Sequence, residues 1–387
     1  MSAPTQQVLL DRLSLYDPKR VLNHPDFKII PKGEKPLPDA NIALCYNEKK
    51  EINLVQKPRF DPAPGQVEVH VKSTGICGSD VHFWKHSKIG DSMVVRDCCG
   101  AGHESAGIVT RVGEGVTQWK EGDRVAIECG IPCSECTFCR MGKYNACESV
   151  VFFSTPPYHG TMTRYHLHPA QFLHRLPDNV TFEEGALIEP LTVAMAAIQR
   201  SGLSLSDPLL ICGAGPIGLV NMLAAHAAGA TPIVITDLSE HRLNVAKEIL
   251  PSVKTVLIKK EDTPQQVAKR VKDAASTPIF LALECTGVES SVHSAIYSMH
   301  FGGKVFIIGA GKDIQSFPFM HMSAMEIDIQ YQYRYANMYP RSVRAVEGGL
   351  VNLKSLATHF YKLEDGIEGF MTASDPSTGA IKVQIID

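Results

Sequence analysis

One segment, LLICGAGPIGLVNMLAAHAAGATPIVITD, limits the folds open to this 387-residue chain more than any other. It predicts a buried strand, then Gly213, Gly215 and Gly218 at the spacing G-x-G-x-x-G, then a helix and a second strand. The first glycine permits a tight turn, the second a close approach to a pyrophosphate, and the third close packing of helix on strand. The helix N-terminus then faces the negative charge. The segment therefore predicts a doubly wound α/β domain that binds a dinucleotide.

The end of the second strand indicates which dinucleotide is bound. Asp237 stands there, where a carboxylate accepts hydrogen bonds from the adenosine ribose and repels a 2′-phosphate. Arg242 follows shortly afterwards and, by itself, would favour NADP. On spacing alone, Asp237 also fits a helix N-cap and Arg242 an exposed helix position. Because the carboxylate stands at the strand end, we expect NAD.

The pattern of apolar residues divides the chain into four parts. Residues 1–40 form a polar extension, with one short helix expected at 6–15. Residues 41–190 contain alternating segments rich in turns and predict a mostly-β domain. Residues 191–330 alternate strands with helices, which predicts a parallel sheet, and residues 331–387 are expected to pack back on the first domain. Three segments carry the β alternation, namely residues 67–75, 105–113 and 123–129.

Composition excludes several classes of function. The formal net charge is −3, so no basic face suggests a nucleic-acid partner. No apolar run approaches the roughly 20 residues that span a bilayer. The longest apolar run near the N-terminus, Val8-Leu9-Leu10, is too short for a signal-peptide core. We therefore expect a cytoplasmic protein that has no membrane partner and whose 11 cysteines stay reduced.

Four cysteines stand close together in the sequence. They are Cys133, Cys136, Cys139 and Cys147. Spacings of two residues let neighbouring thiolates converge on one ion, and four thiolates are typical of a structural zinc site closed to substrate. Vestigial thiols and an iron–sulfur cluster are the alternatives. A zinc ribbon that binds nucleic acid would need basic flanks, and the segment has only Arg140 and Lys143.

A second candidate metal site joins residues that are far apart in sequence. Cys77, in GICGSDVHFW, follows a predicted strand, and His103 and Glu104, in GHESAG, precede another. Taken singly, such a cysteine is usually a small buried residue, and such a His-Glu pair is usually a surface or packing pair. Zinc held by Cys and His beside a dinucleotide site is, however, an alcohol-oxidation catalyst, because the metal polarises a bound hydroxyl.

These motifs, together with GDRVAIE, EEGALIEPL and TDLSEHR, resemble those of the zinc-containing medium-chain alcohol and polyol dehydrogenases. The resemblance covers nearly all of residues 41–387 and implies a GroES-like catalytic domain followed by a Rossmann domain. Simple alcohol dehydrogenases of the family have a cysteine where this chain has Glu189, whereas the sorbitol dehydrogenase branch has glutamate. Within that branch, FFSTPP, ECTGVESS, QYRY and ASDPSTGAIKVQI are most similar to the fungal L-arabinitol 4-dehydrogenases.

The resemblance implies a role for each matching residue. The catalytic zinc ligands are Cys77, His103, Glu104 (directly or through water) and Glu189. Ser79 and His82 relay the substrate proton, and Phe83, Arg334 and Tyr335 contact the substrate. The cofactor contacts are Gly213, Gly215, Ile217, Gly218, Asp237, Arg242, Gly309, Gln332, Tyr333 and Arg334.

The implied activity is oxidation of a pentitol or hexitol, L-arabinitol first, to a ketose with hydride transfer to NAD. Galactitol, sorbitol and xylitol are alternative substrates, and a simple alcohol or threonine dehydrogenase is a further alternative. The family also implies a homotetramer. The chain departs from the family pattern at three places, of which the first two bear on substrate specificity and the third has no role in the family. Phe83 stands where animal sorbitol dehydrogenases have tyrosine, ANMYP follows Tyr335, and a cysteine pair, Cys98-Cys99, precedes GHESAG.

Overall fold

The structure is a computed structural model that describes residues 14–387, and these form two compact units. Unit 1 joins the chain up to Glu189 with Ala357–Asp387, and unit 2 is Pro190–Leu356. The sequence prediction placed the return to the first unit at residue 331, which is too early. A strand, β19 (Asp328–Tyr331), and a helix, α12 (Tyr339–Glu347), still belong to unit 2. A mixed pattern after a strand does not show which unit the next helix joins.

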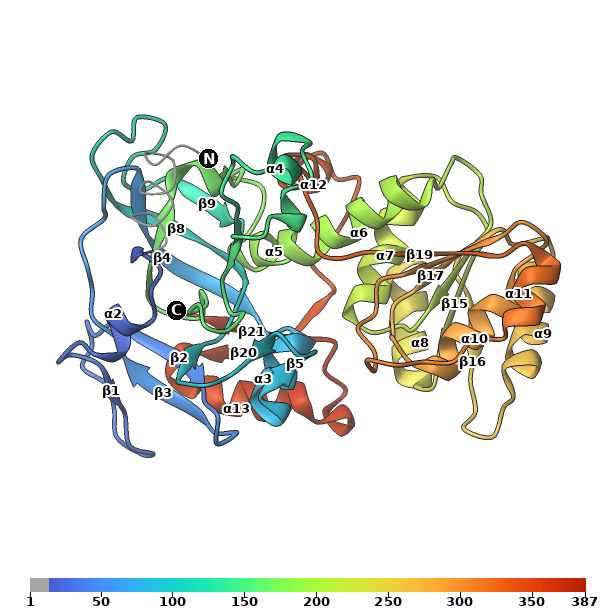
Figure 1. Ribbon diagram of the computed structural model, residues 1–387, viewed down its shortest axis with the longest axis horizontal. Helices are drawn as coiled ribbons and strands as arrows, with labels where there is room; N and C mark the ends of the chain where they lie inside the picture. Colours follow the sequence, from blue (N-terminus) through green and yellow to red (C-terminus); the bar gives the residue numbers. More distant parts are fainter. Residues whose placement is uncertain (1–13) are drawn as a thin grey trace. The chain divides into compact units, whose positions relative to one another are not determined.

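The larger sheet of unit 1 is mostly antiparallel, with the order β13-β9-β8-β4-β21-β20, and β12 also pairs with β4 (Figure 1). Each of the three alternating segments overlaps one of its strands, as predicted. The last two strands of the chain, β20 and β21, are parallel to each other and complete this sheet. The strands are β4 (Gln66–Gly75), β8 (Glu104–Val112), β9 (Arg124–Ile127), β12 (Tyr165–Pro169), β13 (Leu173–Arg175), β20 (Ala357–Lys362) and β21 (Lys382–Ile386).

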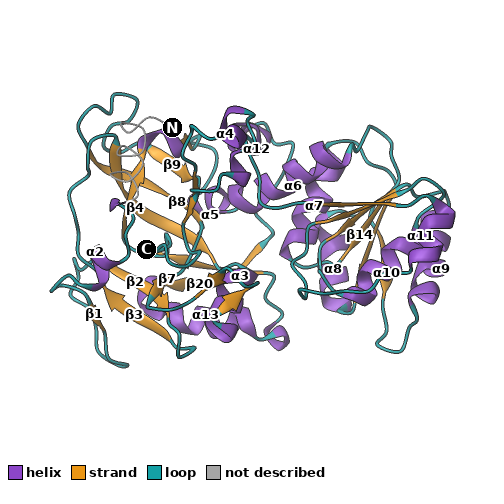
Figure 2. Ribbon diagram, viewed as in Figure 1, coloured by secondary structure: helices purple, strands orange, loops and turns teal. Residues whose placement is uncertain are grey.

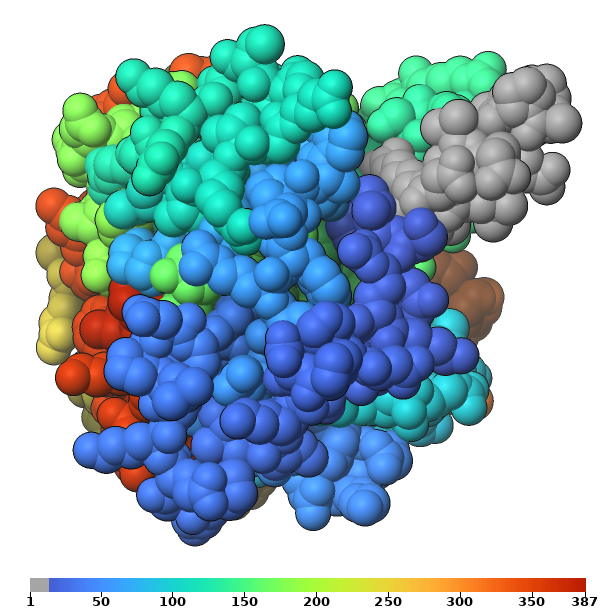
Figure 3. Space-filling view, turned by 90° about the vertical axis from the view of Figure 1, so that its left-hand side faces the viewer, coloured from blue at the N-terminus to red at the C-terminus, as the bar shows by residue number. Residues whose placement is uncertain are grey.

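A smaller sheet of unit 1 includes part of the N-terminal extension. Its order is β1-β3-β2-β7, with strands β1 (Lys28–Ile29), β2 (Ile42–Tyr46), β3 (Ile52–Gln56) and β7 (Cys99–Gly100). Arg164 donates to the carbonyl oxygens of Pro38 and Ala40 at 3.0 and 2.9 Å, which ties the extension to unit 1. Figure 3 shows this early segment, in dark blue, lying across one face. The helix expected at residues 6–15 falls mainly on residues 1–13, outside the described residues.

Unit 2 is a doubly wound domain, as predicted. Its sheet is wholly parallel, with the order β16-β15-β14-β17-β18-β19, and helices flank it (Figure 2). The order reverses between β14 and β17, the position where such sheets bind ligands beyond their carboxyl ends. The other elements are β14 (Leu209–Cys212), β15 (Ile233–Asp237), β16 (Lys254–Leu257), β17 (Leu281–Glu284), β18 (Lys304–Ile307), α7 (Pro216–Ala227), α8 (Glu240–Ile249), α9 (Pro264–Ala275), α10 (Glu289–Ser298) and α11 (Phe319–Met325).

The remaining α-helices and strands lie mostly in unit 1. They are α2 (Lys19–Leu22), α3 (Gly78–His86), α4 (Thr137–Arg140), α5 (Phe182–Ala186), α6 (Ile188–Ser201), α13 (Gly366–Ser374), β5 (Lys88–Ile89), β6 (Met93–Val94), β10 (Gly130–Ile131) and β11 (Val151–Phe152). Within residues 14–387, no helix has the length and apolar character needed to cross a membrane.

Candidate active site and structural metal site

The fold brings Cys77, His103 and Glu104 together in unit 1. Cys77 lies between β4 and α3, His103 directly precedes β8, and Glu104 is the first residue of β8. One ligand atom from each lies within 4.8 Å of the others. Antiparallel pairing places Gly75 opposite Glu104, and a Cβ at Gly75 would lie 2.1 Å from the Glu104 carboxylate. Glycine at this strand end therefore leaves the space that the Glu104 side chain occupies.

Asp80, which the sequence prediction did not include, organises this cluster. Its fully buried carboxylate accepts from the backbone N–H of Cys77 at 3.0 Å and of Gly102 at 3.2 Å. The same carboxylate lies 3.5 Å from Nδ1 of His103. Burial alone would raise the pKa of Asp80, but His103 and hydrogen bonds from the Ser154 hydroxyl and the Cys77 N–H lower it. Because Asp80 faces Nδ1, the other ring nitrogen, Nε2, is left for a metal.

Lys382 is a second residue that the sequence prediction missed. Its ammonium group donates to both carboxylate oxygens of Glu104, at 2.8 and 2.7 Å, and both side chains are buried. Burial alone would lower the pKa of Lys382, but the Glu104 carboxylate raises it. Lys382 lies on β21, 278 residues from Glu104, so no local motif could have indicated the pair.

Glu189 lies close to this cluster but outside the group of three ligand atoms. It occupies the first turn of α6 and is 6% exposed. Its negative charge contributes to the raised pKa of Lys382 and, together with burial, to that of Cys129. The thiol of Cys129 in turn donates to the carbonyl oxygen of His103 at 2.9 Å. Direct ligation by Glu189 stays a prediction.

Three predicted site residues on α3, Ser79, His82 and Phe83, differ in environment. Ser79 is half-buried and His82 is exposed, with its ring 4.5 Å from that of His86. Burial first, and then His86, lower the pKa of His82, which favours a neutral imidazole. Phe83 is 2% exposed and stacks on Tyr46 with ring centroids 5.7 Å apart. Phe83 thus belongs to the core, and its contact with substrate stays a prediction.

The four clustered cysteines converge around the turn formed by α4. Their sulfur atoms all lie within 4.8 Å of one another, with Cys133–Cys139 at 3.9 Å and Cys136–Cys139 at 3.4 Å. Tetrahedral zinc with bonds of about 2.3 Å requires sulfur separations of roughly 3.8 Å, so the donor set fits zinc. Although burial raises it, the pKa of Cys133 is lowered to about 7 by backbone N–H groups, including that of Cys136.

The glycine turn of unit 2 has the geometry that the motif predicts. Gly213 has a φ of +96°, and a Cβ at Gly218 would lie 1.8 Å from the Gly213 carbonyl oxygen. Gly215 is the N-cap of α7, whose next residues are Pro216 and Ile217. Gly213 and Gly218 do not accept a side chain without strain or movement of the backbone, so these two have the steric roles that the sequence suggested. The close approach of Gly215 to a pyrophosphate stays a prediction.

Asp237 braces this turn from the end of β15. Its carboxylate accepts from the backbone N–H of Ala214 at 2.7 Å and of Ser239 at 2.8 Å. Ser239, rather than Asp237, is the N-cap of α8, because its hydroxyl accepts from the backbone N–H of Arg242. Gly213, Asp237 and Arg242 line a cavity of about 370 Å³.

The other predicted cofactor and substrate residues of unit 2 follow β18 and β19. Gly309 lines a cavity of about 430 Å³, and a Cβ there would lie 2.2 Å from the Gly287 nitrogen. The amide of Gln332 donates to the carbonyl oxygen of Val193 at 2.7 Å. Arg334 is half-buried, and its guanidinium lies 4.7 Å from the ring centroid of the exposed Tyr333. Tyr335 is buried.

Comparisons with known proteins agree with this geometry. The profile of the alcohol dehydrogenase GroES-like domain matches residues 63–178, and that of the zinc-binding dehydrogenases matches residues 216–348. L-arabinitol 4-dehydrogenase of Aureobasidium melanogenum is 54% identical over 84% of this chain and 88% of its own length. That of Aspergillus oryzae is 51% identical over 90% and 96%. Sorbitol dehydrogenase of Bos taurus is 43% identical over 86% and 93%.

Solved structures show the same fold. 2R,3R-butanediol dehydrogenase of Bacillus subtilis superposes with a TM-score of 0.79 at 28% identity, covering 90% of this chain and 100% of its own. An Escherichia coli oxidoreductase of unknown specificity superposes with a TM-score of 0.81 at 33% identity, covering 90% and 99%. The chain belongs to the zinc-binding dehydrogenases of the alcohol dehydrogenase family, with a GroES-like and a Rossmann unit.

Proposed function

We propose that this enzyme oxidises a polyol, with L-arabinitol as the first candidate, to a ketose and transfers the hydride to NAD. The observation that carries the proposal is the likeness to L-arabinitol 4-dehydrogenases, which is 54% and 51% in the two relatives described and extends over most of both chains. The likeness to a sorbitol dehydrogenase is lower, at 43%. A glutamate at position 189 supports a polyol rather than a simple alcohol.

The donor set of Cys77, His103 and Glu104, with Glu189 nearby, fits a zinc ion with an open coordination position. Zinc bound there supplies Lewis acidity, which lowers the pKa of a coordinated hydroxyl group. Asp80 fixes the ring of His103, and Lys382 balances the buried charge of Glu104. These contacts hold His103 and Glu104 in one arrangement. The two ligands therefore do not have to reorganise when substrate enters.

Proton removal is assigned in this proposal to α3. Ser79 accepts the hydroxyl proton at Oγ as it donates its own proton outward, directly or through water. His82, exposed and favoured as a neutral imidazole, then accepts that proton and exchanges it with solvent. In the Rossmann unit the glycine turn accepts the pyrophosphate, and Asp237 accepts from the ribose hydroxyls. The hydride chemistry itself is supplied by NAD.

The choice of NAD over NADP rests on Asp237. Each of its oxygens already accepts one backbone N–H and has a lone pair left for a ribose hydroxyl. A 2′-phosphate would bring negative charge against this carboxylate. Arg242, Lys259 and Lys260 line the same cavity and are the groups that would favour a phosphate. We propose that the carboxylate dominates, since it stands at the strand end that meets the ribose.

A substrate panel tests this proposal. Initial rates of NADH or NADPH formation are measured on the zinc-loaded enzyme, with NAD and with NADP, for L-arabinitol, xylitol, sorbitol, galactitol, ethanol and threonine. We expect the highest kcat/KM with L-arabinitol and NAD. A preference for another polyol would replace L-arabinitol as the proposed substrate and leave the polyol class unchanged. Specificity within that class is open to such a change, because Phe83 lacks the hydroxyl that animal sorbitol dehydrogenases have there. A preference for ethanol or threonine, or no turnover with any compound, would reject the proposal.

We further propose that the enzyme is a homotetramer located in the cytoplasm. The edge strand β19 of the parallel sheet supports assembly through this edge, since Tyr331 on it is 57% exposed. Light scattering on the purified protein tests the tetramer, and a monomeric mass would contradict it. A fluorescent fusion in the source cell tests the location, and an organellar or secreted signal would contradict it.

A further inference from the structure

Two cysteines outside both metal clusters approach each other in the smaller sheet of unit 1. Cys45 lies on β2, and Cys98 directly precedes β7. The antiparallel register pairs Cys45 with Gly100, so Cys98 stands two residues from the partner of Cys45 and on the same face of the ladder. Cys98 packs against the small core cluster that contains Cys45, and each thiol shifts the pKa of the other.

The two thiols differ in exposure and in charge. Cys45 is fully buried, whereas Cys98 is half-buried and reaches the surface. The pKa of Cys98 is lowered, first by the Cys45 thiol and then by the positive charge of Lys57. Burial and the negative charges of Glu48 and Asp97 raise it, but they do not outweigh these effects. Interaction with Cys98 and burial raise the pKa of Cys45. Cys98 is therefore the nucleophile of the pair, and Cys45 is the protonated partner.

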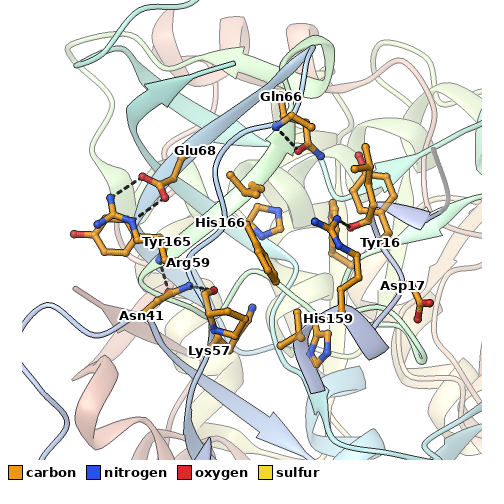
Figure 4. Close-up of a pocket in the computed structure, with 18 of the residues that line it drawn as sticks. Tyr16, Asp17, Asn41, Lys57, Arg59, Gln66, Glu68, His159, Tyr165 and His166 are labelled. Carbon is orange, nitrogen blue, oxygen red and sulfur yellow. Dashed lines mark hydrogen bonds and ion pairs between the residues drawn. The ribbon is translucent and has the colours of Figure 1, made fainter. Parts of the chain in front are cut away.

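Lys57 supplies the positive charge beside this pair. It follows β3 and also lines a cavity of about 110 Å³ together with His159 and His166 (Figure 4). Burial lowers the pKa of Lys57, and the charges that raise it are those of neighbouring thiols, Cys45 first and Cys98 second. Lys57 is therefore the positive charge near this pair, and it favours the thiolate of Cys98.

Other cysteines beyond the metal clusters lack this combination. Cys99, the neighbour of Cys98 in sequence, donates to the carbonyl oxygen of Tyr158 at 3.3 Å, and burial raises its pKa to about 12. Burial likewise raises the pKa of Cys129, Cys212 and Cys285. These thiols stay protonated at neutral pH and react slowly with oxidants.

We propose that Cys45 and Cys98 are an oxidisable dithiol that closes a reversible disulfide when the enzyme meets hydrogen peroxide. The Cys98 thiolate attacks one peroxide oxygen, the O–O bond breaks, and hydroxide leaves, which gives a sulfenic acid on Cys98. The Cys45 thiol then attacks that sulfur, the S–S bond forms, and water leaves once the thiol proton is transferred. Two thiols are oxidised and one peroxide is reduced to two waters. A thiol reductant reverses the step by exchange.

The cross-link is compatible with the folded enzyme. The strands that carry the pair are already joined by their backbone pairing and by the hydrogen bond from Ala101 N–H to the Leu44 carbonyl oxygen at 2.8 Å. Closing a sulfur–sulfur bond of about 2.05 Å requires the two side chains, which share one face of the ladder, to rotate toward each other. We therefore expect the oxidised enzyme to keep its zinc and most of its activity. Retention of both would show that oxidation occurred in the folded chain.

Peptide mass spectrometry on zinc-loaded enzyme treated with a small excess of hydrogen peroxide tests the proposal. We expect a Cys45–Cys98 cross-link that dithiothreitol removes. The Cys98→Ser variant should form no cross-link and leave Cys45 reduced. The Cys45→Ser variant should accumulate a sulfenic acid on Cys98, trapped by dimedone. Cys99→Ser is the matched control, since it removes the adjacent thiol and should cross-link like wild type.

Several outcomes would overturn the proposal. One is a sulfenic acid that persists on Cys98 of the wild-type enzyme without a cross-link. Another is oxidation of the four-cysteine lobe (Cys133, Cys136, Cys139 and Cys147) before Cys98, which would place the most reactive thiols elsewhere. A cross-link that appears only in protein that has lost its zinc and activity would also reject it, because the pair would then close only after unfolding. Slower alkylation of Cys98 by iodoacetamide in Lys57→Met than in wild type is expected, and an unchanged rate would remove the role of Lys57.

Discussion

The four-cysteine lobe and the Cys77 cluster each bring metal-ligating atoms within 4.8 Å of one another, but the chain builds them in opposite ways. The lobe takes all its ligands from one short segment around α4, and three of its four cysteines are half-buried. The catalytic cluster takes its ligands from two distant segments, and His103 and Glu104 are buried. Asp80 and Lys382 surround it with buried partners.

This difference fits the two kinds of zinc site that we propose. Four thiolates complete a tetrahedral shell, so the lobe leaves no position for a substrate. The mixed donor set of the catalytic cluster leaves a position open, and its buried charges must then be balanced by the protein itself. The lobe needs only a local turn, whereas the catalytic cluster depends on the whole of unit 1.

The largest effect that would separate the two clusters is expected from Cys77→Ser. Loss of the catalytic ligand should lower kcat/KM by about ten-thousandfold, or roughly 5.5 kcal/mol, because Lewis-acid activation is removed. The thermal midpoint should stay close to wild type. Initial rates and circular dichroism on zinc-replete protein measure both. Cys285→Ser is the control thiol in unit 2, and near-normal turnover of Cys77→Ser would contradict the assignment.

Removing the cation that balances the catalytic cluster should mainly affect stability. Lys382→Met leaves the buried Glu104 carboxylate without its partner, which costs about 3–5 kcal/mol. Urea unfolding should show a lower midpoint with an unchanged slope. The double variant Lys382→Met/Glu104→Gln should recover part of the loss, since the unpaired charge is gone. Equal midpoints for Lys382→Met and wild type would show that the pair is not needed.

A smaller effect is expected from the carboxylate that orients the zinc histidine. Asp80→Asn keeps the shape of the side chain but removes its charge beside His103, so zinc affinity or activity should fall by about 10- to 100-fold. Competition with a chelator measures the affinity. Arg140→Gln, which changes a charged residue of the lobe turn, is the matched control and should leave catalysis unchanged. If Asp80→Asn behaves like this control, Asp80 has only a packing role.

The four-cysteine lobe was easier to predict from the sequence than the Cys77 cluster, because its ligands come from one short segment. The lobe ligands were predicted because their spacing is local. Cys77, His103 and Glu104 were found through motifs flanking strands, and the structure brings them together. Asp80 was visible in GICGSD but had no role until the fold placed it beside His103. Lys382 was visible in ASDPSTGAIKVQI, but nothing in that segment indicated a partner 278 residues away. The return at residue 357 was missed because helix α12 looks no different in sequence whichever unit it joins.

The smallest effect concerns buried groups of unit 1 that do not bind metal. Burial lowers the pKa of His168 to about 3 and that of His166 well below its usual value. The unfolded chain therefore binds more protons between pH 6.5 and 3, so the free energy of unfolding falls as pH falls through this window. The expected slope is about 1.4 kcal/mol per pH unit for each histidine. His168→Gln should reduce the slope by one proton, and an unchanged slope would contradict this account.

The most direct test of the two-site account is the zinc content of three proteins measured by native mass spectrometry, with the thermal midpoint recorded alongside. Wild type should carry one zinc in each cluster. Cys77→Ser should keep the lobe zinc and the wild-type midpoint. Cys133→Ser should lose the lobe zinc and unfold at a lower temperature. Wild-type zinc content together with wild-type stability in Cys133→Ser would contradict the claim that the lobe is a structural zinc site.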